Sequence, residues 1–110
     1  MTPEQRIEAF RHFVEKRPDD AFARYSLAMA LRTAGRAEEA AAAFAELRRR
    51  LPDYVPAYLM LGQVLEGMGR DAEAAEAYDA GVAAAARAQD HHARSELSQA
   101  LDALRARGAR

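Results

Sequence analysis

The residues of this chain that could do chemistry are its three histidines and its 17 acidic side chains, since cysteine is absent. His91 and His92 follow Asp90, and these residue types can bind a metal ion. Adjacent positions on a helix point in different directions, however, whereas an i, i+4 pair could reach one ion. We therefore expect no metal site, and we interpret Asp90 as the cap of a helix start.

The paired carboxylates are poor candidates for acid–base catalysis. Glu38 and Glu39, and likewise Glu73 and Glu76, occur near expected helix starts or on solvent faces, where acidic side chains interact favourably with the helix dipole. His12 fits an exposed helix position. The sequence has no Gly-rich phosphate loop and no nucleophile with a plausible base. We therefore expect no catalytic residue, no cofactor and a non-enzymatic protein.

Charge and composition argue against nucleic acid and membrane as partners. The formal net charge is −1, so the basic footprint of a nucleic-acid-binding protein is missing. The run Arg48–Arg50 precedes Pro52, where cations meet the negative end of a helix dipole. The N-terminal segment MTPEQRIEAFRHF has no long apolar run, which argues against a signal peptide or a membrane span. With no cysteine framework either, we expect a cytoplasmic protein.

An internal repeat defines the elements that carry these residues. Alanine makes up about a quarter of the chain, which favours helix, and the scarcity of valine and isoleucine disfavours strands. A shift of 34 residues brings 21–54 onto 55–88. It aligns Leu27 with Leu61, Ala28 with Gly62, Leu31 with Leu65, Gly35 with Gly69, Ala40 with Ala74 and Phe44 with Tyr78. The chain therefore contains two copies of a helix–turn–helix unit.

The same register extends towards both ends of the chain. Phe10 corresponds to Phe44, which makes the N-terminal segment the second half of a unit. Leu97, Leu101 and Leu104 recur at i, i+4 and i+7 and indicate a further helix. We predict a single domain of six helices, at about 3–17, 21–34, 37–51, 55–67, 71–88 and 91–107. Its parts are a half-repeat at 3–17, repeats at 21–54 and 55–88, and a capping helix at 91–107.

This register resembles the tetratricopeptide repeat, whose 34-residue unit follows the pattern W-x2-L-G-x2-Y … A-x3-F … P. The first unit matches it with Arg24, Leu27, Ala28, Leu31, Ala40, Phe44 and Pro52, and the second with Tyr58, Leu61, Gly62, Leu65, Ala74, Tyr78 and Ala86. The chain is identified as a small stand-alone bacterial-type member. The resemblance implies an all-α, right-handed solenoid of helix pairs.

Individual positions of the pattern have physical roles. Ala28 and Gly62 are expected where the two helices of a unit cross, opposite Ala40 and Ala74. Phe44 and Tyr78 are expected as aromatic wedges between units, and Asp19 and Asp53 as helix N-caps. Ala86 stands where the pattern has a proline, so we expect the fifth helix to run about one turn longer.

The resemblance also implies a binding surface, because the first helix of each unit lines a concave face on which relatives bind extended peptides or helices. By register the residues on this face are Tyr25, Met29, Arg32, Leu59, Met60, Gln63 and Glu66, continued by Arg94 and Leu97 of the last helix. Alternatively, Met29, Leu59 and Met60 belong partly to the core and Tyr25 packs on the first helix. We expect a peptide or helix of a partner protein to bind here.

Two further interpretations concern partners. One group of relatives holds the C-terminal carboxylate of a chaperone tail with Lys, Asn and Arg side chains, but of the corresponding positions here only Arg94 fits. We therefore do not expect this clamp. The N-terminal helix carries an apolar stripe without a partner on its outer side, formed by Ile7, Phe10, Phe13 and Val14. The alternative function is accordingly a self-associating scaffold, a homodimer through this helix or through the groove.

Overall fold

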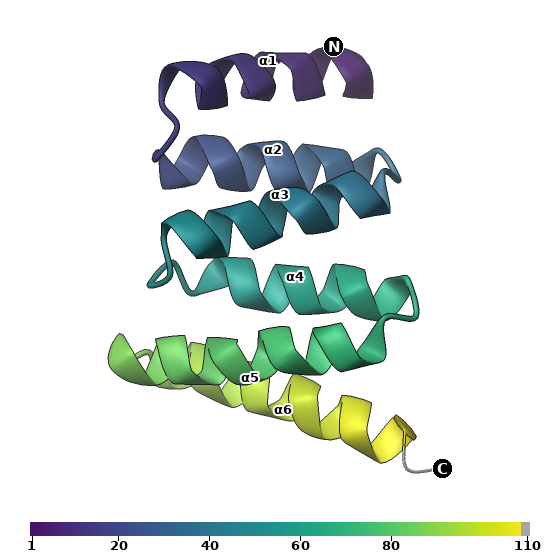
Figure 1. Cartoon of the computed structure of the whole chain (residues 1–110), viewed down its shortest axis with the longest axis vertical. Helices are drawn as coiled ribbons and strands as arrows, with labels where there is room; N and C mark the ends of the chain where they lie inside the picture. Colours follow the sequence, from purple (N-terminus) through teal and green to yellow (C-terminus); the bar gives the residue numbers. More distant parts are fainter. Residues whose placement is uncertain (109–110) are drawn as a thin grey trace.

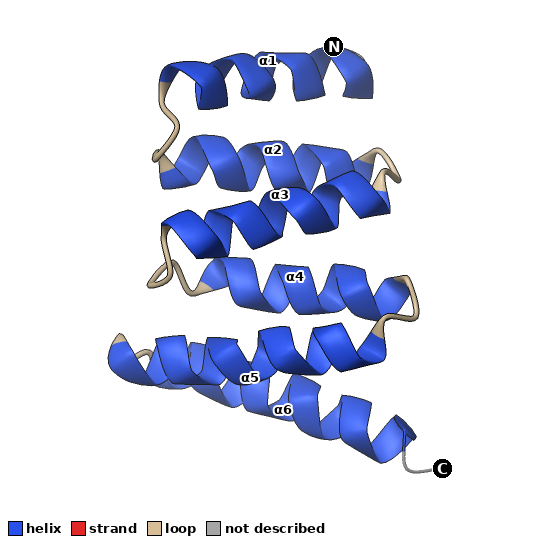
Figure 2. Cartoon of the chain, in the orientation of Figure 1, coloured by secondary structure: helices blue, strands red, loops and turns tan. Residues whose placement is uncertain are grey.

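Residues 1–108 are described by a computed structural model and form six α-helices that run back and forth along a stack (Figure 1). The helices are α1 (Pro3–Lys16), α2 (Ala21–Thr33), α3 (Ala37–Arg50), α4 (Pro56–Gly67), α5 (Asp71–Arg87) and α6 (His91–Gly108). Each packs on the next one in the chain, and short turns join them, with no strand in this part of the chain (Figure 2). The predicted all-α solenoid is confirmed, and every helix begins and ends within one residue of its predicted range.

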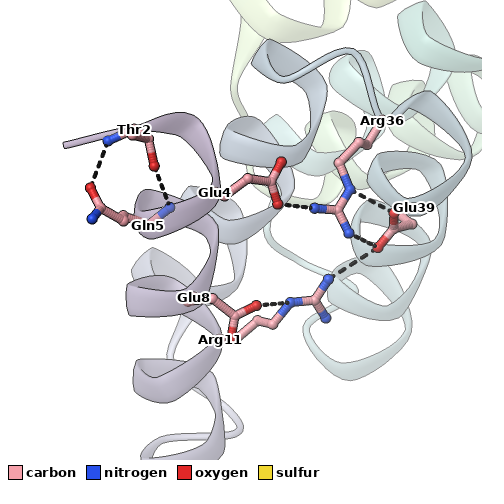
Figure 3. A network of polar contacts seen from close by, with 7 residues as sticks. All are labelled: Thr2, Glu4, Gln5, Glu8, Arg11, Arg36 and Glu39. Carbon is pink, nitrogen blue, oxygen red and sulfur yellow. Dashed lines mark hydrogen bonds and ion pairs between the residues drawn. The ribbon is translucent and has the colours of Figure 1, made fainter.

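Polar side chains fix the starts of three helices. At α1 the Gln5 N–H donates to the Thr2 hydroxyl at 3.1 Å, and the Thr2 N–H donates to the Gln5 side chain at 2.9 Å (Figure 3). This reciprocal capping satisfies two of the free N–H groups of a first turn. The carboxylates of Asp20 and Asp90 each accept a first-turn N–H at 3.0 Å, for α2 and α6 respectively. The prediction that Asp90 caps a helix is confirmed.

The predicted caps Asp19 and Asp53 are wrong. The residue that caps α2 is Asp20, directly before the helix, and α4 begins without any side-chain cap. Asp19 instead forms an ion pair with Arg50 at 3.0 Å, and Asp53 forms one with Arg87 at 3.2 Å. The two aspartates therefore link the turns between units to the C-terminal ends of α3 and α5.

The repeated aromatic residues form the centre of the core. Phe44 and Tyr78 are buried, but they contact Tyr25 and Gly62 of their own units, so their predicted role as wedges between units stays a prediction. The side chain nearest to Gly62 is Tyr78 and not Ala74, since a Cβ built at Gly62 would lie 2.1 Å from Tyr78 Cε1. The absence of a side chain at Gly62 thus lets the ring lie directly against the backbone of α4.

The longer fifth helix positions the capping helix. α5 has 17 residues and α3 has 14, which confirms the predicted extra turn. α6 then packs on α5 with Leu97, Leu101 and Leu104 buried. At Gly81 a Cβ would lie 2.8 Å from Leu97 Cδ2, so the glycine permits the close approach of these two helices.

A repeated ion-pair bridge connects the turn inside each unit to the helix that follows it and to the last helix of the preceding unit. Arg36 donates to both carboxylate oxygens of Glu39, at 2.7 and 2.9 Å, and to Glu4 of α1 at 2.7 Å (Figure 3). Arg70 repeats this geometry 34 residues later with carboxylates of α5 and α3. Exposed ion pairs contribute little free energy each, so these bridges connect neighbouring units without carrying much of the stability.

Candidate functional site on the concave face

Three alternate helices, α2, α4 and α6, line a hollow of about 300 Å³, on the face that the repeat register predicts to be concave. We call it the concave hollow. Its lining residues are Tyr25, Val55, Pro56, Leu59, Met60, Asp90, Ala93, Glu96 and Leu97. The structure therefore brings together Tyr25, Leu59 and Met60, which the repeat register places on one face.

Tyr25 forms one wall of the concave hollow. Its ring packs edge-on against Phe44 at a centroid distance of 6.0 Å and against Tyr54 at 5.9 Å. Burial raises the pKa of the Tyr54 hydroxyl, consistent with a tight aromatic cluster at this end of the unit. Tyr25 thus packs on α3 and the turn after it, and these contacts hold its ring in place.

Leu59, Met60 and Leu97 form the apolar floor of the concave hollow. Leu59 and Met60 are half-buried and pack against the core while also lining the hollow. Leu97 is almost fully buried and belongs to the core itself. The two interpretations left open by the sequence, groove and core, therefore both describe Leu59 and Met60.

Arg32 and Gln63 bond to each other and do not line the concave hollow. Arg32 Nη1 donates to Gln63 Oε1 at 3.1 Å and lies 3.2 Å from Met60 Sδ. These contacts cross from α2 to α4 next to the hollow and occupy the polar groups that the sequence suggests for ligand binding. The guanidinium therefore holds Met60 in place.

Glu66 is engaged within the fold. It accepts a hydrogen bond from the Tyr78 hydroxyl at 2.8 Å and another from Arg107 Nη2 at 2.9 Å. Burial, followed by this bond to Glu66, raises the pKa of Tyr78. Glu66 therefore connects α4, α5 and α6, and it is not among the residues that line the concave hollow.

The remaining groove candidates lie elsewhere. Met29 lines a separate hollow of about 220 Å³ together with α1 residues, away from Leu59 and Met60. Arg94 is exposed and is not among the lining residues. The α6 wall carries instead the carboxylates of Asp90 and Glu96, so the rim of the concave hollow is acidic and not basic. The sequence does contain a signal for Glu96. The leucines of α6 follow those of α4 at a spacing of 36 residues and not 34, so Glu96, and not Arg94, corresponds to Met60.

The apolar stripe of α1 differs from the prediction. Ile7 is fully buried against the rest of the stack, so it cannot belong to a self-association surface. Phe10 and Val14 are half-buried, and Phe13 is 51% exposed. The most exposed aromatic residue is Phe22, at 74%, and it was not selected from the sequence. It could have been found, because it is an apolar residue near the start of α2 that lies outside the periodicity of the core residues, which indicates an exposed apolar side chain.

Other kinds of site find little support in the part of the chain that is described. Within residues 1–108 no group of three or more His, Cys, Asp or Glu side chains could hold a metal ion. Each arginine of the basic run forms an ion pair, Arg48 with Glu76 and both Arg49 and Arg50 with Glu46. None of the helices between residues 1 and 108 is both long and apolar enough to cross a membrane.

Comparison with known proteins gives two kinds of match. Models of the tetratricopeptide repeat match residues 21–64 and 55–87. The chain is 34% identical to a tetratricopeptide repeat domain protein from Salinibacter ruber, with a TM-score of 0.75 over 79% of this chain and 88% of that one. Comparison with curated protein sequences gave no match.

More distant solved structures share the fold. The TPR2B domain of yeast Sti1, solved as a pHsp70 complex, is 22% identical, with a TM-score of 0.83 over 92% of this chain and 81% of that one. The type III secretion translocator chaperone SycD of Yersinia enterocolitica is 14% identical, with a TM-score of 0.87 over 98% of this chain and 75% of that one. On the repeated sequence, the stacked helix pairs and these matches, the chain belongs to the tetratricopeptide repeat family.

Proposed function

We propose that this protein is a non-enzymatic protein-interaction module that binds a peptide or a helix of a partner protein in the concave hollow. Membership of the tetratricopeptide repeat family supports a general protein-binding role. The observation that carries the proposal is the meeting of Tyr25, Leu59 and Met60 from alternate helices around one hollow of about 300 Å³. A likeness in fold to the yeast Sti1 domain, solved as a pHsp70 complex, is consistent with it.

The lining of the concave hollow suggests the chemistry of the ligand. Leu59 and Met60 offer an apolar floor, and a methionine side chain adapts to differently shaped partners. Glu96 on the rim favours a basic residue next to the apolar one, whereas the Asp90 carboxylate is already bonded to the start of α6. We expect a segment with one large apolar side chain flanked by Lys or Arg. With so small a contact its Kd would be on the order of micromolar.

The test uses two matched variants. Partners captured by the wild-type protein from its host are identified by mass spectrometry, and the binding segment is titrated against Leu59→Glu and Met29→Glu. Both variants place a carboxylate at a half-buried apolar position that the repeat register assigns to the same face, but only Leu59 lines the concave hollow. We expect Leu59→Glu to abolish binding and Met29→Glu to retain it. Equal binding by both would rule out the hollow as the site.

Self-association is the alternative function, and the observation that favours it is the exposure of Phe13 and Phe22. Sedimentation equilibrium over a wide range of protein concentration tests it. A dimer that dissociates in Phe13→Ser would support this alternative, and a monomer at every concentration would dismiss it.

A further inference from the structure

A second exposed surface lies at the N-terminal end of the stack, on the side of α1 and α2. It consists of Arg6, Phe10, Phe13 and Arg17 along α1 and its C-cap, with Phe22 and Met29 of α2, and we call it the N-terminal face. Two hollows between these helices form it, one of about 340 Å³ beside Phe13 and Phe22 and one of about 220 Å³ beside Phe10 and Met29. In Figure 1, α1 is the end of the stack and has a helix on one side only.

The repeat itself shows what kind of element fits this face. Residues of α3 that correspond to Arg6, Phe10 and Phe13 after a shift of 34 are Ala40, Phe44 and Leu47, and all three are fully buried. They are buried because α2 packs on α3, as α4 packs on α5. The same three positions of α1 are exposed or half-buried because no helix among residues 1–108 occupies the corresponding place. The row is therefore shaped to receive a helix.

The α2 side of the face leads to the same conclusion. Ser26 and Met29, which line the smaller hollow, correspond to Met60 and Gln63 after a shift of 34. Arg32 of the preceding α2 contacts both of those residues. A helix that packs on α1 as α2 packs on α3 would therefore also contact Met29.

Charge decides which helix fits. Arg6 lies at one end of the row and Lys16 and Arg17 at the other, and no carboxylate forms an ion pair with any of the three in the described chain. Asp20 lines the same hollow as Lys16, but its carboxylate accepts the first-turn N–H of α2. A two-fold dimer of α1 on α1 would set Arg6 against either Arg6 or Arg17 of the second copy, so cations would face cations and destabilise it.

We propose that the N-terminal face binds an amphipathic helix of another protein, whose apolar stripe covers Phe13 and Phe22 and whose carboxylates meet Arg6 at one end and Lys16 and Arg17 at the other. Such a helix needs apolar residues at i, i+4 and i+7, which lie on one face of a helix. The bridge from Arg36 to Glu4, and that from Arg11 to Glu39, hold α1 against the stack while its outer side stays open (Figure 3).

The probe for this proposal is a synthetic helical peptide of about 16 residues, with leucines at i, i+4, i+7 and i+11, alanines between them and glutamates at both ends. A control peptide carries lysines in place of the glutamates. Binding to the full chain is measured by calorimetry, and the contact residues are located by NMR chemical-shift changes. We expect the acidic peptide to bind at least about tenfold more tightly than the basic one, with shifts on α1 and α2.

Variants make the test specific. Phe13→Ser with Phe22→Ser changes two exposed residues and should weaken binding about tenfold or more. Lys16→Glu with Arg17→Glu should reverse the preference, so that the basic peptide binds better. Leu59→Glu, in the concave hollow, should change nothing, which separates this proposal from the proposed function. Equal binding of both peptides, or shifts confined to α4 and α6, would refute it. A dimer that these serine substitutions dissociate would assign the face to a second copy instead.

Discussion

Gly62 offers the sharpest test of how this solenoid is packed. A Cβ at this position would lie 2.1 Å from Tyr78 Cε1 and 2.5 Å from Tyr78 Cδ1, whereas ordinary contacts begin at 3.4 Å. In Gly62→Ala the ring or the helix must therefore move by about 1.3 Å, the difference between those distances. The ring has little room to move, because it is buried and its hydroxyl is bonded to Glu66.

Two opposing effects determine how much Gly62→Ala changes the free energy of unfolding. Alanine is favoured over glycine inside a helix by about 1 kcal/mol, and overpacking a core costs about 1–3 kcal/mol or somewhat more. We expect the steric cost to win and the free energy of unfolding of Gly62→Ala to fall by about 1–2 kcal/mol. Gly67→Ala is the matched control, since a Cβ at this other glycine of α4 meets nothing within 4 Å. The free energy of unfolding of Gly67→Ala should increase by up to about 1 kcal/mol.

Urea unfolding followed by far-UV circular dichroism gives the free energy of unfolding of both variants, and thermal unfolding with the same signal gives their Tm. For a domain of this size, Gly62→Ala should lower Tm by about 5 °C or more, and Gly67→Ala should raise it by a few degrees. A double-mutant cycle with Tyr78→Leu isolates the contact, because the cost of Gly62→Ala should shrink once the ring is removed. If Gly62→Ala is as stable as Gly67→Ala, the close packing of Tyr78 on α4 is refuted.

The remaining predictions concern charge. Burial raises the pKa of Tyr78, so above pH 10 the unfolded state releases a proton that the folded state keeps. The free energy of unfolding should therefore decrease as the pH rises, by up to about 1.4 kcal/mol per pH unit, and urea unfolding of Tyr78→Phe should show a smaller decrease. The hydrogen bond from Arg48 lowers the pKa of Glu76 below 4.5. This pair therefore stabilises the folded state above pH 4.5, and its contribution is lost as the pH falls through the lowered pKa. Thermal unfolding of Glu76→Gln should accordingly show a smaller loss of Tm between about pH 5 and 3 than the wild type shows. Arg70→Ala should shift the urea midpoint less than Gly62→Ala does, and its difference from wild type should vanish in about 1 M NaCl; a persistent difference would show a role beyond exposed ion pairs.

Local patterns predict most of the fold. Alanine-rich segments, the turns at Gly35 and Gly69 and the 34-residue spacing of leucines and aromatics locate all six helices to within a residue. Both glycines have positive φ, +77° and +74°, a conformation that glycine adopts without strain. These features depend on neighbours in sequence, so the sequence alone determines them. The failed caps Asp19 and Asp53 mark the limit, because a one-residue difference in turn geometry decides which side chain reaches the first helical turn.

The binding face is less accessible from sequence, because it depends on how long side chains meet across helices. The register places Tyr25, Met29, Leu59 and Met60 on one side of their helices, and the structure leaves Met29 in a different hollow from the other three. Nothing in the repeat pattern indicates that Arg32 reaches across to α4, a contact that depends on the distance and tilt between two helices.

The sequence by itself determined that this chain is a stack of six helices with a repeated core, because hydrophobic period, helix propensity and turn residues act locally. Only the tertiary structure decided which side chains remain open to a partner. The extra turn of α5 moves α6 out of the 34-residue register, so that Glu96 and not Arg94 lines the concave hollow. The packing of α1 on α2 buries Ile7 and leaves Phe13 and Phe22 exposed, since burial depends on which neighbouring helix is present and not on the residue's own type.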